Sequence, residues 1–87
     1  MEIIGKVIEV LDVVSGENEN GEWRRGGFVV ETLGDYPSHL MLELSGDRLD
    51  TIKPNHGQIV KAKFSVSSRK IGDRWYTNAR CFEMTVY

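Results

Sequence analysis

The C-terminal third of the chain, Gly57 to Tyr87, constrains the fold most strongly because it has the pattern of one long β-hairpin. Apolar residues alternate with lysine and serine in its first half: Val60, Ala62, Phe64 and Val66 against Lys61, Lys63, Ser65 and Ser67. A period of two is typical of a strand with one buried face. The pattern predicts strands over Ile59–Ser68 and Arg74–Tyr87, joined by a turn at Arg69–Asp73 that contains Gly72.

The remainder of the chain predicts three more strands and one short helix. The strands are expected near Met1–Val14, Trp23–Leu33 and His39–Ser45, with a polar loop over Ser15–Gly21. A change of apolar parity near Ile8 predicts a β-bulge, and Gly26-Gly27 in the second strand predicts a second bulge or a sharp coil. After Gly46, residues 47–53 fit one or two helical turns, with Asp47 as a candidate N-cap and Pro54 at the end.

Five strands with one helix between the third and fourth give the order βββαββ. Short, bent strands with glycine at the corners favour a closed barrel, which leaves no exposed edge. An all-β, five-stranded Greek-key barrel of this size is the OB-fold. An SH3-like barrel is the alternative, but it does not need the helix. At 87 residues the chain is expected to form a single OB-fold domain, residues 1–87.

Composition argues against several classes of function. No apolar run approaches the length of a membrane span, and the N-terminus lacks the features of a secretory signal, so a cytoplasmic protein is expected. The lone Cys81 is expected to be a small buried side chain. His39 and His56 lie in different turns without metal-ligand spacing, so neither a metal nor a cofactor is expected. No nucleophile–base arrangement is present, and the chain is predicted not to be an enzyme.

The net charge of −2 conceals an asymmetry between the two parts of the chain. Residues 1–56 have a balance of −6, whereas residues 57–87 have a balance of +4. An acidic chain does not by itself indicate nucleic-acid binding, but a local basic patch is compatible with it. The two parts could equally neutralise each other within the fold or between subunits.

Several short motifs carry a family resemblance along nearly the whole chain. They are Met1-Glu2-Ile3, Gly5-Lys6, Ser15-Gly16, Gly21-Glu22-Trp23, Tyr36-Pro37, Glu43-Leu44, Gly46-Asp47, Ser68-Arg69 and Arg74-Trp75-Tyr76-Thr77. On these residues the chain resembles a short uncharacterised bacterial OB-fold family, a domain of unknown function. It is also similar to single-stranded-DNA-binding and primosomal replication OB proteins. The resemblance implies an OB-fold, while the family supplies no role of its own.

Two departures from the family pattern reduce the expected affinity for a polyanion. The loop after the first strand carries Glu17, Glu19 and Glu22 where the family tends to be basic, and Ser45 stands where an aromatic residue is frequent. The usual OB binding face lies on the second and third strands. If Phe28, Val30, Leu40, Leu42 and Leu44 point inward, that face exposes Val29, Glu31, Met41 and Glu43.

Two hypotheses for function remain, with a small-molecule or sugar-binding role as a lesser one. In the first, the chain binds single-stranded DNA or RNA through the last hairpin. Rings would stack on bases and cations would hold phosphates. The rings are Trp23, Trp75 and Tyr76, and the cations are Arg24, Arg25, Lys61, Lys63, Arg69, Lys70, Arg74 and Arg80, with Lys6 at the margin. In the second, the chain is a protein-interaction or self-assembly module, a homo-oligomer or a partner-binding protein, with no nucleic-acid ligand.

Overall fold

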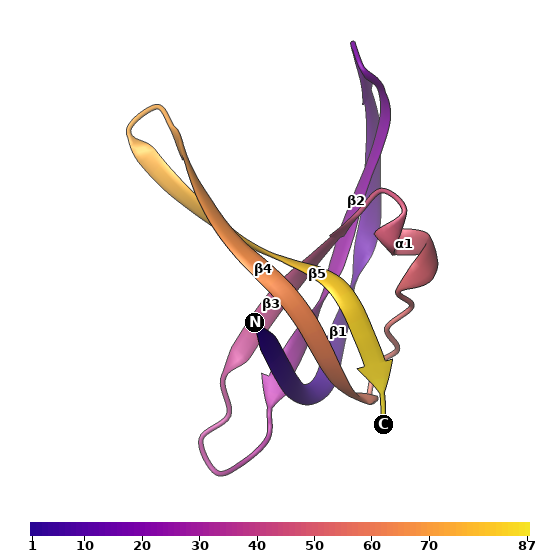
Figure 1. The fold of residues 1–87 in the computed structure, drawn as a ribbon, viewed down its shortest axis with the longest axis vertical. Coiled ribbons are helices and arrows are strands. Elements are labelled where there is room, and N and C mark those ends of the chain that lie inside the picture. The colour runs from indigo at the N-terminus through magenta and orange to yellow at the C-terminus, as the bar shows by residue number, and fades with distance from the viewer.

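The computed structural model describes residues 1–87 and contains the predicted elements in the predicted order. The strands are β1 (Glu2–Asn18), β2 (Gly21–Thr32), β3 (His39–Ser45), β4 (Ile59–Ile71) and β5 (Arg74–Val86), and α1 (Arg48–Thr51) lies between β3 and β4. They form a closed barrel in the order β1-β2-β3-β5-β4 (Figure 1). Only β3 and β5 are parallel. This confirms the five-stranded Greek-key OB-fold with a short helix after the third strand.

The core is built from alternate residues of every strand, as the period-two pattern predicts. Val7, Phe28, Val30, Leu42 and Val60 are fully buried. Leu44, Ala62, Phe64 and Cys81 complete the strand contribution, and Ile52 enters from the segment after α1. Cys81 is therefore a buried apolar side chain, as predicted, and burial raises the pKa of its thiol.

Two β-bulges bend β1 around the barrel. The pairing with β2 shifts between Val7 and Glu9, which makes Ile8 the extra residue and confirms the first predicted bulge. A second shift lies between Leu11 and Val14, opposite Gly26-Gly27. A second bulge therefore does occur at Gly26-Gly27, as predicted, but its extra residue belongs to β1 and not to β2. Gly27 serves a different need, because a Cβ there would collide with the Leu42 carbonyl of β3.

The predicted loop over Ser15–Gly21 is also wrong. β1 continues to Asn18 and β2 begins at Gly21, so only Glu19 and Asn20 form the turn. The Asn20 backbone N–H donates to Asn18 Oδ1 at 2.9 Å, and Gly21 has a φ of 112°. This part of the ladder has left the barrel and both of its faces meet water. A strand there does not need apolar residues, so the sequence lacks the alternation that would reveal it.

The last hairpin likewise extends further than predicted. β4 runs to Ile71, and the turn contains only Gly72 and Asp73 instead of the whole of Arg69–Asp73. Two long ribbons therefore leave the barrel at the same end. We call residues 14–25 arm 1 and residues 65–80 arm 2. Figure 1 shows both arms above the barrel and the β2–β3 connection below it. The radius of gyration is 13.9 Å, against about 12 Å for a compact chain of this length.

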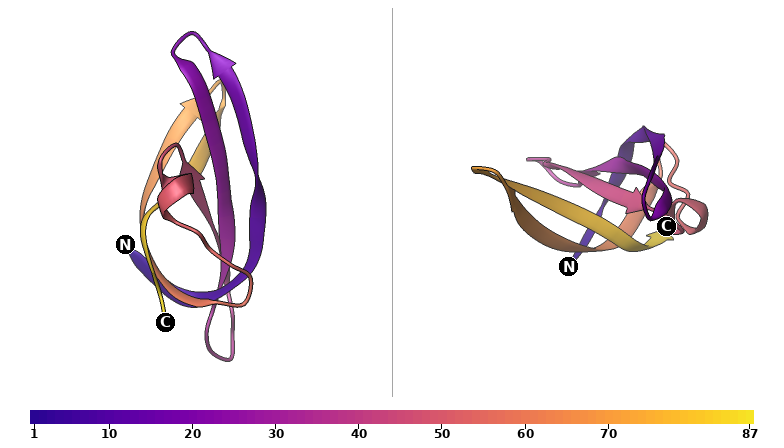
Figure 2. Two further views of the ribbon diagram at one scale, coloured as in Figure 1. Left: turned by 90° about the vertical axis from the view of Figure 1, so that its right-hand side faces the viewer. Right: turned by 90° about the horizontal axis from the view of Figure 1, so that it is seen from above.

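Helix α1 is a single turn, within the one or two predicted, and lies beside β2 and β3 (Figure 2). Asp47 is its N-cap residue, as predicted, although its side chain makes no capping hydrogen bond. The prediction that Pro54 ends the helix is wrong, because Ile52 is already extended. Ile52 leaves the helix because its side chain is buried in the core. The absence of a side chain at Gly26 gives Leu49 of α1 room against β2.

Candidate functional site

One side of the sheet runs without interruption from β2 to β4 and carries two exposed rings and four arginines. Odd-numbered residues of β2 point away from the core, since Phe28 and Val30 point into it. Arg25 pairs with Ser45 and Gly27 pairs with Glu43 on β3. Glu43 in turn neighbours Arg80 on β5, and Arg80 pairs with Ser65 on β4.

The same side continues along arm 2. Asn78, Tyr76 and Arg74 of β5 point to the same side as Arg80, because side chains alternate along a strand. Arg69 of β4 lies directly opposite Tyr76. We call this surface the outer face. It contains Trp23, Arg25, Met41, Glu43, Arg69, Arg74, Tyr76 and Arg80.

At the β2 end of the outer face, Trp23 and Arg25 form a supported platform. The Trp23 ring lies against the backbone of Gly16, where a Cβ would come within 2.7 Å of it, and the residue remains 39% exposed. The Arg25 guanidinium carbon lies 5.7 Å from the ring centroid, within the range of a cation–π contact. Arg25 Nε also lies 3.2 Å from Glu43 Oε1. The cation is thus held between the ring and the carboxylate.

Glu43 was expected to be an exposed carboxylate that repels polyanions, and this expectation is wrong. It is only 7% exposed, because Arg25 covers it across the strand. Gly27, directly opposite Glu43, has no side chain to keep the arginine away. The other carboxylate of this face, Glu31, is also paired, with its Oε2 3.0 Å from His39 Nε2.

The platform borders two hollows in the surface. A groove of about 310 Å³ lies on the outer face between arm 1 and β3. It is lined by Leu11, Asp12, Val14, Trp23, Arg25, Gly26, Met41 and Glu43. A wider hollow of about 630 Å³ separates the base of arm 1 from the connection after β3. Trp23 and Arg25 line both hollows, so a ligand in either one would contact them.

The acidic residues of arm 1 do not share this face. Glu17 and Glu22 are directly opposite each other, one residue out of phase with the Gly16–Trp23 pair. Alternation therefore places them on the other side of the arm. Two like charges at this position are unfavourable for the hairpin. Glu22 nevertheless lines the wider hollow beside Trp23 and Arg25, and Asp12 lines the groove.

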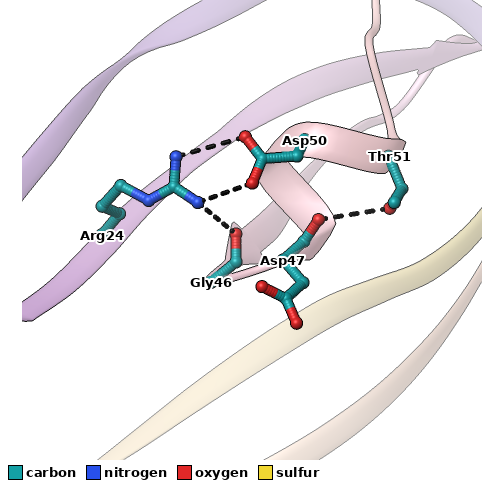
Figure 3. Close-up of polar contacts among 5 residues, drawn as sticks. All are labelled: Arg24, Gly46, Asp47, Asp50 and Thr51. Carbon is teal, nitrogen blue, oxygen red and sulfur yellow. Dashed lines mark hydrogen bonds and ion pairs between the residues drawn. The ribbon is translucent and has the colours of Figure 1, made fainter.

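Arg24, a predicted phosphate ligand, is directed elsewhere (Figure 3). Its guanidinium contacts both oxygens of Asp50, at 3.2 and 2.8 Å, and donates to the Gly46 carbonyl at 3.3 Å. The hydrogen bond and the charge of Arg24 lower the pKa of Asp50, and the same contacts raise the pKa of Arg24. Arg24 therefore ties α1 and the connection before it to β2.

Four other predicted site residues also lie apart from the outer-face cluster. Lys61 and Lys63 sit where β4 pairs with β1, with Lys61 Nζ 4.0 Å from Glu2 Oε2 and Lys63 Nζ 3.5 Å from Glu83 Oε2. Lys70 and Trp75 form a cross-strand pair on the opposite side of arm 2 from Arg69 and Tyr76. Trp75 is 68% exposed there.

The remaining predicted cations are unengaged. The ion pairs of the structure use Arg24, Arg25, His39, Lys61 and Lys63, which leaves Arg69, Arg74 and Arg80 of the outer face without an acidic partner. The structure thus groups six of the predicted residues, Trp23, Arg25, Arg69, Arg74, Tyr76 and Arg80, on one face. The sequence did not reveal that Glu43 pairs with an arginine. Its position among the outward-facing residues of the third strand was the one indication, because it placed Glu43 within reach of an arginine on the second strand.

The chain matches one known protein family over nearly its whole length. The family described as a domain of unknown function, DUF3127, matches residues 2–85. The chain belongs to the DUF3127 family. No curated protein is detectably similar to it in sequence.

Solved structures show the fold of this DUF3127 chain independently. The mitochondrial single-stranded DNA-binding protein Rim1 of S. cerevisiae superposes with a TM-score of 0.71 at 9% identity, over 99% of this chain and 91% of Rim1. The dimeric N-terminal domain of PriB from Thermoanaerobacter tencongensis gives a TM-score of 0.64 at 18% identity, over 100% of this chain and 93% of that domain. At these identities the likeness establishes the OB-fold.

The DUF3127 chain contains neither a cluster of metal ligands nor a membrane-spanning helix. No three His, Cys, Asp or Glu side chains lie close enough together to hold a metal ion. Its helix is neither long nor apolar enough to cross a membrane. The outer face offers aromatic rings, arginines and the buried carboxylate of Glu43.

Proposed function

We propose that this DUF3127 chain is a non-enzymatic OB module that binds single-stranded nucleic acid along its outer face. The observation that carries the proposal is the continuity of that face. The Trp23–Arg25 platform stands at one end, and Tyr76 with the unpaired Arg69, Arg74 and Arg80 stands at the other. The fold likeness to Rim1, described as a single-stranded DNA-binding protein, supports the same reading.

The proposed division of work follows from the chemistry of the side chains. A single strand presents phosphates along one edge and unstacked bases along the other. The arginines would hold phosphates, while Trp23 and Tyr76 would stack on bases, each contact contributing about 1–3 kcal/mol. Both rings are partly exposed, at 39% and 47%, so a base can reach them without unfolding the barrel. In this arrangement Arg24, Lys61 and Lys63 do not contact the ligand. They form ion pairs within the fold.

Binding can be measured by fluorescence anisotropy with a labelled single strand of mixed sequence, at about 50 and 200 mM salt. The proposal predicts tryptophan quenching, because Trp23 lies in the contact, and an affinity that falls steeply with salt. The same sequence as a blunt duplex should bind more weakly, since its bases are not available for stacking. Absence of binding to the single strand at micromolar protein and low salt would reject the proposal.

A second function, self-association, is favoured by the charges of the two arms. Arm 1 carries Glu17, Glu19 and Glu22 near its tip, and arm 2 carries Arg69, Lys70 and Arg74. Ile71 and Trp75 of arm 2 are also 54% and 68% exposed. The acidic arm of one copy could therefore meet the basic arm of another. Sedimentation velocity over a concentration series should then show a dimer that dissociates as salt is added. A monomer at every concentration would reject it.

A further inference from the structure

We propose that the groove between arm 1 and β3 is a nucleobase pocket that prefers guanine, with Glu43 as the group that reads the base. This inference rests on the proposed function, since the pocket would receive one base of a bound single strand. Stacking and phosphate contacts do not depend on the nucleotide sequence. The pocket would add a preference for one base to these contacts.

The pocket has the composition of a ligand site. Its walls are apolar and aromatic, formed by Leu11, Val14, Trp23 and Met41, and its charged groups are Asp12 at the β1 side and the Arg25–Glu43 pair. A volume of about 310 Å³ is at the lower end of the range for small-ligand pockets. Trp23 and Met41 are 39% and 50% exposed, so the apolar lining is open to an incoming ring.

The carboxylate of Glu43 is held in place and still able to bind. Its side chain is only 9% exposed, and Oε1 lies 3.2 Å from Arg25 Nε. Oε2 has no ion-pair partner, yet it is not sealed away from the surface. A carboxylate has about four acceptor positions, so one pairing leaves both oxygens able to accept more hydrogen bonds. Arg25 neutralises the charge of Glu43, so Asp12 is the one carboxylate of the groove without an ion-pair partner.

Guanine complements this pair of groups with two adjacent donors beside an acceptor, whereas cytosine can donate only its N4–H to the carboxylate. The guanine N1–H and exocyclic N2–H donate side by side and can both reach a carboxylate, while its O6 accepts from the guanidinium of Arg25. Thymine and uracil have a single N–H flanked on both sides by carbonyl oxygens. Those oxygens would face the lone pairs of Glu43, so the pocket should disfavour them.

The test compares three labelled single strands of equal length in anisotropy titrations. One contains only thymine, one has every third base replaced by guanine, and one has inosine at those same positions. Inosine retains O6 and N1–H and lacks only the N2 amino group. The wild-type protein should bind the guanine strand about 10-fold more tightly than the thymine strand, and inosine should remove most of that gain.

Variants then assign the preference to Glu43. Glu43→Gln keeps the size of the side chain but replaces one acceptor oxygen with a donor, so the preference should fall to about 2-fold. Asp12→Asn, which alters the other carboxylate that lines the groove, should retain the full preference, as should Glu31→Gln outside the groove. Thermal melting shows whether each variant is folded, and the inosine comparison in the wild-type protein does not depend on any variant.

The outcomes separate this inference from the function on which it rests. If the wild-type protein binds all three strands equally, or if Glu43→Gln is folded and keeps the preference, the pocket does not read guanine although the chain binds nucleic acid. If no strand binds, the proposed function fails as well.

Discussion

Replacing Arg69 and Arg74 with alanine should change how strongly binding depends on salt. Three arginines of the outer face have no acidic partner, Arg69, Arg74 and Arg80, whereas Arg25 is paired with Glu43. If each of the three neutralises one phosphate of a single strand, the slope of log affinity against log salt should be about −2.1. Removing two of the three contacts should reduce it to about −0.7.

The matched control removes the same charge from a different part of β4. Lys61 and Lys63 lie beside β1 and already face Glu2 and Glu83. Lys61→Ala/Lys63→Ala should therefore leave the slope near the wild-type value. Both Arg69 and Arg74 are exposed, so the test variant should keep its free energy of unfolding within about 0.5 kcal/mol of wild type.

The assay is an anisotropy titration of one labelled single strand at several salt concentrations for the three proteins, with urea unfolding to verify stability. An unchanged slope in Arg69→Ala/Arg74→Ala would refute the assignment of arm 2 to the ligand. An equal loss of slope in both double variants would show that binding follows overall charge and not the outer face.

Three further perturbations test other parts of the structure. Trp23→Ala should cost about 1–3 kcal/mol of binding free energy in the same titration, whereas Trp75→Ala, on the other side of arm 2, should cost little; equal losses would contradict the face assignment. Gly27→Ala should lower the free energy of unfolding in urea by about 1–3 kcal/mol, because the new Cβ meets a β3 carbonyl; an unchanged value would contradict this. Arg24 holds the pKa of Asp50 below its usual 3.8, so the pair stabilises the fold above that pH and ceases to as the pH falls through the lowered pKa. Wild type should thus melt above Asp50→Asn near neutral pH and match it in strong acid; a difference that persists in strong acid would contradict this.

The barrel could be predicted where burial imposes a pattern on the sequence. Val60, Ala62 and Phe64 alternate with polar residues because one side of β4 is in the core. The bulge at Ile8 was visible because it moves the apolar residues of β1 to the other parity. The arms could not be predicted, because they have no buried face. Ser15–Asn18 meet water on both faces, and no alternation is required of them.

The candidate site was predictable in its residue types but not in its grouping. Which cations share a face depends on strand register, and register is set by distant pairs such as Glu43 with Arg80. The pairing of Arg24 with Asp50 joins residues 26 positions apart, so no local sequence motif predicts it. Glu43 was predicted to be an exposed charge, because the sequence does not show that Arg25 covers it from the neighbouring strand.

The most direct test of the central claim, that the outer face is the nucleic-acid-binding surface, is an NMR titration of the ¹⁵N-labelled protein with a single strand. The largest chemical-shift changes should occur at the Trp23 indole N–H and at the amides of Tyr76 and Arg80. The amides of Lys61 and Lys63 should change little. Changes centred on the β1–β4 pairing, or no changes at the outer face while the strand binds, would show that the nucleic acid binds elsewhere.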